Sequence, residues 1–424
     1  MVAPSSDTFV PPPVRSLKDL ELPTLWLQDL ALKILYFRGY LTGHELAKLM
    51  ALPYMGVVSE ILEDLKKDKL VEIRGARTGV GPSAYEYTLT TLGMQRAREA
   101  LERSQYAGPA PVPFHRYVQA VRKQARSRPI VTEREVRQML AHLVLKDEVI
   151  HRLGPAINSG LAIFLYGPPG DGKTSISQAI GRYLLRDAIY IPFSLYIGGQ
   201  VIVLFDASVH HPVEVPNSSQ VDARWVRIRR PFLMVGGELT LEDLDLIFDP
   251  VNKFYQAPVQ VKANGGMLLV DDFGRQRVRP QALLNRWIVP LESRVDYLTL
   301  HTGQKIEVPF DVLVVFSTNL PPKNLVDEAF LRRLRHKIHI GDPGFKEFRE
   351  IFRRVAEQRG IAFSERGLAY LIQEWYVKPG RPLRASHPRD LCDILLDIAR
   401  YRNAKPSMTP ELLEEAAKIY FVDA

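Results

Sequence analysis

Several features of common protein classes are missing from this sequence of 424 residues. Its single cysteine, Cys392, has no partner for an intramolecular disulfide or for a thiolate zinc site. No apolar run reaches the length of a membrane span, and the N-terminus lacks the basic and apolar regions of a signal peptide. Internal repeats and heptads are also absent. The sequence therefore predicts a cytoplasmic protein without a membrane span.

The overall composition is that of a folded chain. Hydrophobic residues make up 46% and charged residues 25% of the sequence, far from a disordered composition. The formal net charge of +8 is compatible with a nucleic-acid partner, with an acidic protein partner or with neither. Because the chain is too long for one compact domain, we expect two or three domains, each with its own core.

Composition and periodicity divide the chain into five parts. Residues 1–24 are rich in proline and poor in apolar side chains, which predicts a flexible leader. Residues 25–106 follow the order helix, helix, helix, strand, turn, strand, helix, which is typical of a winged-helix-like α+β domain. A proline-rich stretch and a basic segment indicate a linker at 107–130. Residues 131–341 predict an α/β domain with a parallel sheet flanked by helices, and 342–424 predict an all-helical lid.

Short patterns place individual elements within these parts. Thr42 and Glu45 form a capping box at the start of the second helix, and Thr409 with Pro410 opens a helix near the C-terminus. An apolar stripe on the third helix is formed by Val57, Val58, Ile61, Leu62 and Leu65. Strands are expected at Leu70–Arg74, Tyr85–Leu89, Leu161–Tyr166, Met267–Val270, Val312–Phe316 and Lys337–Ile340.

A phosphate-binding loop is the strongest chemical signal in the sequence. It follows an apolar strand, matches G-x-x-x-x-G-K-[ST], and consists of Gly167, Pro168, Pro169, Gly170, Asp171, Gly172, Lys173 and Thr174, with Ser175 next in the helix. Its backbone N–H groups and the helix dipole favour the phosphates of ATP. Lys173 is expected to reach the β- and γ-phosphates and Thr174 to help hold Mg²⁺. The negative charge of Asp171 does not help, so we expect it to face away.

A pair of carboxylates ends the apolar strand Met267–Val270. Asp271 fits the Mg²⁺-binding position of a Walker B element, and Asp272 fits the position of the general base that activates water. An aspartate is shorter than the glutamate usual at this position. Slow hydrolysis, or a nucleotide-gated scaffold without turnover, is therefore an alternative to a fast ATPase.

In this order the motifs resemble those of the AAA+ superfamily, within the helix-2-insert clade that includes the MoxR-like ATPases. The resemblance extends from about Pro155 to Phe421. It implies that Asn319 is a sensor that positions water, that Arg389 contacts the γ-phosphate in cis, with Arg384 a weaker candidate, and that Arg333, or else Arg332, reaches the nucleotide of a neighbouring subunit. It also implies a homo-oligomeric ring, with six subunits expected.

Two expected hairpins carry the same resemblance. One spans Asp245–Val261 about the turn Asp249-Pro250-Val251-Asn252, and the other spans Val295–Val308 around His301-Thr302-Gly303. They are similar to the helix-2 insert and to the hairpin before the first sensor, so both are expected to face a central pore. The strand-rich stretch Ala188–Val215 departs from the family pattern and has no assigned role.

The distribution of charged residues bears on whether the partner is a protein or a nucleic acid. A solvated face or intersubunit salt bridges suit the cluster Arg224, Arg227, Arg229 and Arg230 better than contact with nucleic acid or with an acidic partner does. On the third helix and in the residues that follow it, acidic side chains offset the basic ones, so no basic stripe is available to bind a DNA duplex. Arg74 and Arg77, near the wing, keep DNA binding open as an alternative. We therefore expect a motor that remodels a protein or a macromolecular assembly. The alternative is a nucleic-acid-directed ATPase, a loader or a transcriptional regulator, whose winged helix binds DNA.

Overall fold

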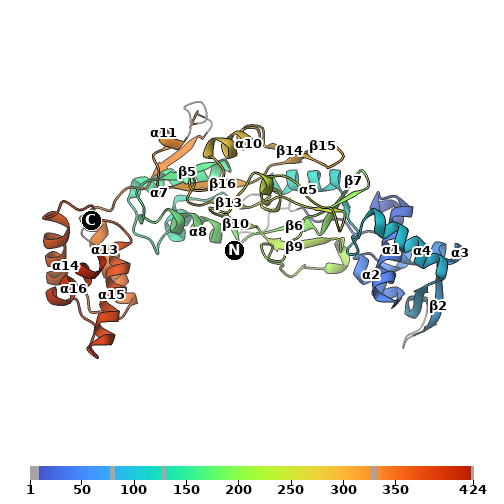
Figure 1. The fold of residues 1–424 in the computed structure, drawn as a ribbon, viewed down its shortest axis with the longest axis horizontal. Helices are drawn as coiled ribbons and strands as arrows, with labels where there is room; N and C mark the ends of the chain where they lie inside the picture. Colours follow the sequence, from blue (N-terminus) through green and yellow to red (C-terminus); the bar gives the residue numbers. More distant parts are fainter. Residues whose placement is uncertain (1–8, 77–81, 127–129, 326–330, 333, 422–424) are drawn as a thin grey trace.

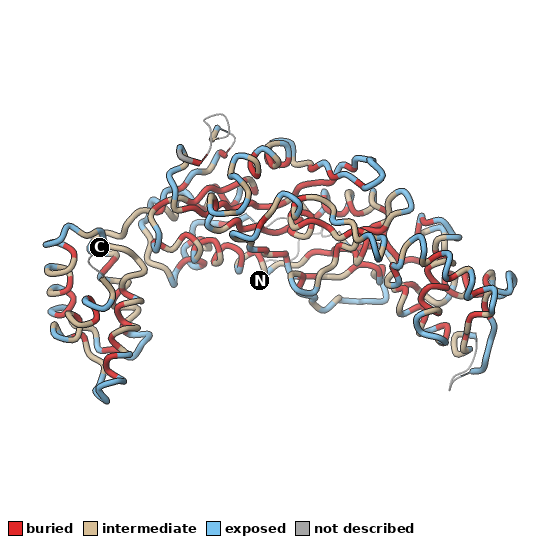
Figure 2. Tube along the Cα trace, in the orientation of Figure 1, coloured by how far each residue is buried: buried red, intermediate tan, exposed pale blue. Residues whose placement is uncertain are grey.

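The computed structural model describes residues 9–76, 82–126, 130–325, 331–332 and 334–421. Figure 1 shows an elongated chain with a parallel sheet in the middle, helices of the N-terminal part at one end and helices of the C-terminal part at the other. Buried segments run through the central strands and along the inner faces of the terminal helices (Figure 2). No described helix combines the length and the apolar character that crossing a bilayer requires.

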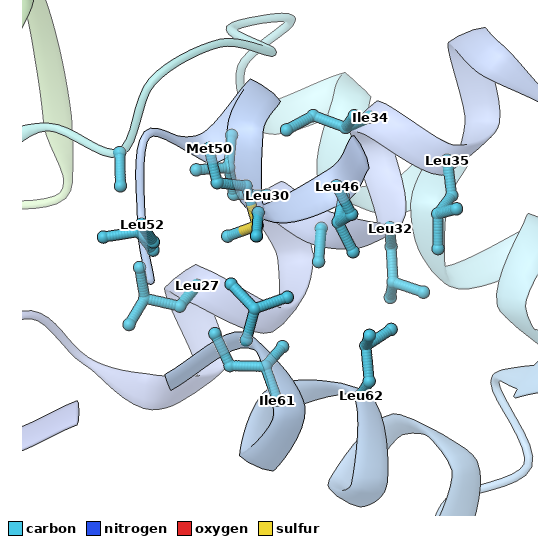
Figure 3. Packing of buried hydrophobic residues seen from close by; sticks show 14 of the residues in the cluster. Leu27, Leu30, Leu32, Ile34, Leu35, Leu46, Met50, Leu52, Ile61 and Leu62 are labelled. Atoms are coloured by element: carbon cyan, nitrogen blue, oxygen red, sulfur yellow. The ribbon is translucent and has the colours of Figure 1, made fainter. Parts of the chain in front are cut away.

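The N-terminal part is a small α+β unit in the predicted order. Its elements are α1 (Thr24–Arg38), β1 (Tyr40–Thr42), α2 (Gly43–Met50), α3 (Ser59–Lys67), β2 (Val71–Ala76), β3 (Tyr85–Leu89) and α4 (Thr91–Arg103). The strands pair antiparallel in the order β1-β3-β2. The capping box of Thr42 and Glu45 is present. The predicted apolar stripe is buried, but its first two residues, Val57 and Val58, lie before α3 begins. Figure 3 shows how Leu27 and Ile61 meet between α1 and α3 in this core.

The prediction of a flexible leader is wrong for residues 9–24, the described part of that segment. Val14, Leu20 and Leu22 are buried in the core of the N-terminal unit, and the ring of Phe9 lies 5.6 Å from that of Trp225. The composition misled because three well-spaced apolar side chains anchor the segment, while its prolines remove backbone donors that would otherwise need partners.

A five-stranded parallel sheet forms the middle of the chain. Its order is β10 (Phe232–Val235), β13 (Met267–Val270), β16 (Leu313–Thr318), β5 (Ile163–Tyr166) and β17 (His336–His339). All four strands expected in this region are confirmed, and β10 is an edge strand that the patterns missed. Both faces are buried, as parallel sheets require. Ile163 and Leu165 face α6 (Glu133–Met139), α7 (Asp147–Ser159) and α8 (Lys173–Leu184), while Phe164 faces α10 (Pro280–Ser293).

A second group of strands, here called the β-layer, lies between this sheet and the N-terminal unit. It contains the mixed sheet β11-β12-β8-β7-β4, the pairs β6-β9 and β14-β15, and the helices α5 and α9. Their bounds are β4 (Val112–Pro113), α5 (Phe114–Arg126), β6 (Ala188–Pro192), β7 (Ser194–Ile197), β8 (Gln200–Val203), β9 (Trp225–Arg229), β11 (Ile247–Asp249), β12 (Phe254–Gln256), α9 (Val259–Lys262), β14 (Val295–Thr299) and β15 (Lys305–Pro309).

The expected linker at 107–130 is an integral part of the β-layer. Its proline-rich stretch pairs with β7 as the edge strand β4, where a missing N–H is tolerated. Tyr117 and Val121 of α5 are buried in the core of the layer. The side chain of Gln124 bonds both the N–H and the carbonyl of Tyr190. The linker prediction was therefore wrong, because basic residues cover only the outer face of an amphipathic helix.

The arginine cluster is also mainly internal to the β-layer. Arg224 is fully buried and binds the carboxylate of Asp222, and Arg230 is buried against Asp187. Arg227 and Arg229 donate to backbone carbonyl oxygens. The prediction of a solvated or intersubunit face is therefore wrong for the two buried members, because their partners lie within the same chain.

Helices make up the C-terminal part. They are α13 (Phe345–Gln358), α14 (Glu365–Ile372), α15 (His387–Tyr401) and α16 (Pro410–Tyr420), and they share one apolar core. Thr409 caps α16 by accepting from the N–H of Leu412, as predicted. Cys392 lies in this core, where burial raises the pKa of its thiol to about 12. The α/β fold with a helical C-terminal region and an N-terminal α+β unit is therefore the one that the sequence predicts.

Candidate functional site

The loop Gly167–Thr174 joins the end of β5 to the start of α8, as predicted. Gly167 has φ 149°, and a Cβ there would lie 1.9 Å from the carbonyl oxygen of Ile340. Gly170 has φ 86°, and a Cβ there would lie 2.5 Å from Oγ of Ser386. Glycine is therefore required where the loop passes β17 on one side and the C-terminal helices on the other.

Lys173 lies across this loop. Its side chain is buried, and Nζ donates hydrogen bonds of 3.0 Å to the carbonyl oxygen of Gly167 and 2.6 Å to that of Pro168. Burial lowers the pKa of the ammonium group, while the nearby carboxylates of Asp171, Asp272 and Asp271 oppose that shift. The cation is thus held beside the loop by neutral oxygens, which a ligand of negative charge can replace.

Thr174 and Asp271 meet at the end of the sheet, although 97 positions separate them in the sequence. The Thr174 hydroxyl lies 3.1 and 3.0 Å from the two carboxylate oxygens of Asp271. Both residues follow buried parallel strands, so their side chains reach the same edge. Hydroxyl and carboxylate oxygens are ligands that Mg²⁺ prefers, so the pair that the sequence assigns to the metal fits that ion.

Asp272 and Asn319 are also brought together. Nδ2 of Asn319 donates to Oδ1 of Asp272 at 3.1 Å. The backbone of Asp272 is left-handed, with φ 46°, a conformation that aspartate adopts more readily than most residues. The expected water-activating carboxylate and the expected sensor therefore lie side by side at the ends of the neighbouring strands β13 and β16.

A cavity of about 450 Å³ opens over this edge of the sheet. Its walls come from the loop, from the ends of β13 and β16, from a segment before α7, and from α13 and the start of α15. The lining residues are His142–Leu145, Pro169–Ser175, Asp272, Ser317, Asn319, Ile351, Arg354, Val355, Gln358, Arg359, Ala385, Ser386 and Arg389. Its apolar lining residues come from the segment before α7 and from α13, where Ile351 and Val355 alternate with Arg354 and Gln358.

The expected arginines are in different situations. Arg389 lines the cavity and pairs with Asp390 at 3.0 Å. Arg384 pairs instead with Asp342 and, at 3.5 Å, with Asp171. Arg332 is exposed and is not among the residues that line the cavity, and Arg333 lies outside the described residues. The cis candidate Arg389 is therefore at the site, and a role in trans for Arg332 or Arg333 stays a prediction.

Asp171 contacts the C-terminal helical region. Its side chain is buried, and Oδ1 accepts from the N–H of Ala385 at 3.2 Å. Burial raises the pKa of its carboxyl to about 6, and the adjacent Asp342 acts in the same direction.

Both expected hairpins form, as β11–β12 and β14–β15. They contact each other, since the imidazole of His301 stacks on Phe248 at 4.3 Å and the backbone N–H of His301 donates to Tyr255 Oη at 2.8 Å. The turn of the first hairpin contacts the N-terminal unit, where Lys253 donates to the carbonyl oxygen of Glu102. The pore that both are expected to face stays a prediction.

The sequence patterns missed the apolar walls of the cavity. His142–Leu145 and residues of α13 such as Ile351 and Val355 line it. They carry no motif, because an apolar wall can be built from any medium-sized apolar side chain. The only available signal was the short run Leu143-Val144-Leu145, which ends before α7 begins.

Comparison with known proteins gives remote similarities. A family model described as a domain of unknown function (DUF8689) matches residues 345–419. No curated protein matches the chain. NtrX from Brucella abortus in complex with ATP is 17% identical, with a TM-score of 0.39 over 65% of this chain and 56% of that chain. The RuvB Holliday junction branch migration motor of Thermotoga maritima is 14% identical, with a TM-score of 0.39 over 70% of this chain and 74% of that chain.

This chain spans 56% of the NtrX chain solved with ATP and 64% of the NtrX chain solved with ADP, both less than two thirds. Similarity of this size identifies no activity.

Proposed function

We propose that the chain binds and hydrolyses ATP as an AAA+-type motor. The observation that carries the proposal is the meeting of Thr174 with both carboxylate oxygens of Asp271 beside a cavity walled by the glycine-rich loop. A chance glycine loop would not bring a hydroxyl and a carboxylate from distant segments to the mouth of a cavity. The combination suits a triphosphate with its Mg²⁺.

Each residue at the edge of the sheet then has a task. Loop N–H groups bind phosphate oxygens, and Lys173 leaves its two carbonyl partners to neutralise the β- and γ-phosphates. Thr174 and Asp271 would hold Mg²⁺, which supplies positive charge to the phosphate oxygens. Asp272 accepts a proton from the attacking water, and Asn319 orients that water together with it.

The apolar walls suit the remaining part of the nucleotide. Leu143 comes from the segment before α7, and Ile351 and Val355 come from α13; we propose that the flat base binds between them. Since α13 supplies two of these three, binding of the base also ties the C-terminal helices to the sheet.

A ring, expected to be a homo-hexamer, completes the proposed site. Arg389 contacts the γ-phosphate from the same chain, while Arg333, or else Arg332, supplies charge to the site of a neighbouring copy. Mixing Lys173→Ala with Arg333→Ala subunits tests this arrangement. Some mixed interfaces pair an intact loop with an intact arginine, so hydrolysis should recover relative to either variant alone. No recovery would reject an active site shared through Arg333.

Nucleotide binding and hydrolysis by the full chain are the direct test of the proposal. Wild type should bind ATP in calorimetric titration and release phosphate in the presence of Mg²⁺. Lys173→Ala should bind ATP much more weakly and should release no phosphate, whereas Lys378→Ala, which removes an exposed lysine paired with Glu374, should keep both binding and hydrolysis. Absence of ATP binding by wild type would reject the proposal. Binding without hydrolysis would favour the nucleotide-gated scaffold.

We further propose that the N-terminal unit recruits a protein client, with cytoplasmic remodelling as the task. Support comes from α3, whose exposed Glu60 and Glu63 would meet a duplex with unfavourable charge. Titration of duplex DNA at rising salt tests the alternative. DNA affinity that falls steeply with salt and is lost in Arg74→Ala would favour a DNA-directed ATPase instead.

A further inference from the structure

An acidic residue inside a phosphate-binding loop calls for a physical explanation, since its charge repels phosphates. In this chain the carboxylate of Asp171 accepts a hydrogen bond from the backbone N–H of Ala385 and lies 3.5 Å from the guanidinium of Arg384. Both partners belong to the segment that leads into α15. The side chain of Asp171 is only 1% exposed, so it points into this contact and not into solvent.

Two further contacts hold the same segment. Arg384 also pairs with Asp342, which lies between β17 and α13. Ser386 packs so closely on Gly170 that no side chain fits at position 170. The loop and the segment that follows β17 thus both hold residues 384–386.

Residues 384–386 lead directly into the helix turn that carries Arg389. Ser386 is the residue before α15, and its side chain forms no hydrogen bond that caps the helix. Arg389 lies in the first turn of α15 and lines the cavity. Because the side chain of Ser386 does not cap the start of α15, the hydrogen bond from Ala385 to Asp171, together with the contacts of Arg384 and Ser386, holds its first turn against the loop.

We propose that Asp171 is a positioning residue that ties the C-terminal helices to the phosphate-binding loop and thereby places Arg389 at the γ-phosphate. The inference rests on the proposed function for the role of Arg389, but the tie between Asp171 and Ala385 does not depend on nucleotide. Arg384 and Asp342 complete the tie, and the positive charge of Arg384 offsets the repulsion between Asp171 and bound phosphates.

The opposing interpretation is that Asp171 acts only through its charge. In that case removing the carboxylate relieves repulsion, tightens ATP binding and leaves the contribution of Arg389 unchanged. If Asp171 positions the start of α15, its removal frees the amide of Ala385 and makes Arg389 ineffective.

Hydrogen–deuterium exchange in the nucleotide-free full chain tests the tie directly. Asp171→Ala should accelerate exchange of the Ala385 amide by roughly tenfold, as expected for loss of a hydrogen bond worth about 1.4 kcal/mol. Asp171→Asn keeps an acceptor oxygen and should retain most of the protection. Glu365→Ala, which removes an exposed carboxylate paired with Arg349 in the same helical region, should have no effect. Unchanged exchange in Asp171→Ala would overturn the inference.

A double-mutant cycle tests the consequence for nucleotide. In the wild-type background, Arg389→Ala should weaken ATP binding roughly tenfold, and in the Asp171→Ala background about twofold, because the arginine is then no longer held in place. Equal penalties in both backgrounds would reject the positioning role. If wild type binds no ATP, the proposed function fails, and the exchange experiment still decides whether Asp171 holds Ala385.

Discussion

Buried charge is treated differently in the β-layer and at the edge of the parallel sheet. In the β-layer, Arg224 is 0% exposed and binds Asp222 and the carbonyl oxygen of Pro111. At the sheet edge, Lys173 is also buried, but its hydrogen bonds go to two neutral carbonyl oxygens of its own loop. A buried cation paired with a carboxylate is part of the fold. One held by neutral groups beside a cavity is free to bind an anionic ligand.

The largest expected effect is the loss of stability when the β-layer pair is broken. Arg224→Ala leaves the carboxylate of Asp222 buried without its partner, which costs roughly 3–5 kcal/mol. Thermal unfolding should show a much lower Tm. Arg229→Ala is the matched control, because this neighbour is exposed and donates to one backbone carbonyl. A change in Arg224→Ala as small as that of the control would mean that its buried pair contributes nothing to the fold.

Lys173→Ala should show the opposite profile. Its two carbonyl partners belong to a loop at a cavity and can be hydrated, so Tm should change little. ATP affinity should fall roughly a hundredfold, since a charge-assisted hydrogen bond contributes about 1.5–3 kcal/mol. Calorimetric titration and thermal unfolding of the same preparation measure both quantities. A large fall in Tm would remove the distinction between the two regions.

The same contrast explains which parts of the fold could be predicted. At the sheet edge, each chemical group follows its own apolar strand within a few residues. Short patterns therefore located Lys173, Asp271 and Asn319, and parallel strand ends brought them together. The β-layer is assembled from segments that lie far apart in the sequence, such as β4 with β7 and β9 with β6.

Local patterns could not reveal those distant pairings. The proline-rich stretch that suggested a linker ends in β4, at the edge of a sheet where Val112 pairs with the distant Leu195 of β7. In the same way, nothing near Phe9 indicates that it meets Trp225. The walls of the cavity were missed because apolar contact with a ligand imposes no motif.

Replacing aspartate by the longer glutamate should have different effects at the sheet edge and in the β-layer. Asp272→Glu extends the expected water-activating group by one methylene, and we expect turnover to rise roughly tenfold, which corresponds to about 1.4 kcal/mol in the barrier. Steady-state phosphate release at saturating ATP measures this change. In the β-layer, Asp222→Glu adds the same methylene to a fully packed pair and should only lower Tm. Unchanged or lower turnover in Asp272→Glu would show that the short side chain does not limit hydrolysis.

The smallest expected effect is a pH-dependent change in stability. Burial, with help from Asp342, raises the pKa of Asp171 to about 6 against the opposing charge of Arg384, so the fold favours its neutral form. Its stabilising contribution is present below pH 3.8 and is lost as pH rises through 6. In the β-layer, burial acts to raise the pKa of Asp206, but hydrogen bonds from Lys262 and Ser208 outweigh it and hold that pKa well below the ordinary value. The contribution of Asp206 is therefore full above pH 3.8 and is lost only on stronger acidification.

Asp171→Asn and Asp206→Asn should therefore change the free energy of unfolding in opposite directions, and only the first change should depend on pH. At pH 7.5, Asp171→Asn removes an unfavourable charge but keeps the acceptor for Ala385, so stability should rise by roughly 1 kcal/mol. At pH 5, inside the window between 3.8 and 6, the gain should shrink to about half, because the wild-type carboxyl is then largely protonated in the fold but still ionised in the unfolded chain. Asp206→Asn should lower stability equally at both pH values, because its carboxylate stays ionised throughout. Thermal unfolding of the three proteins at pH 5 and 7.5 measures this, and a gain for Asp171→Asn that is the same at both values would mean that the ionisation of Asp171 does not oppose the fold.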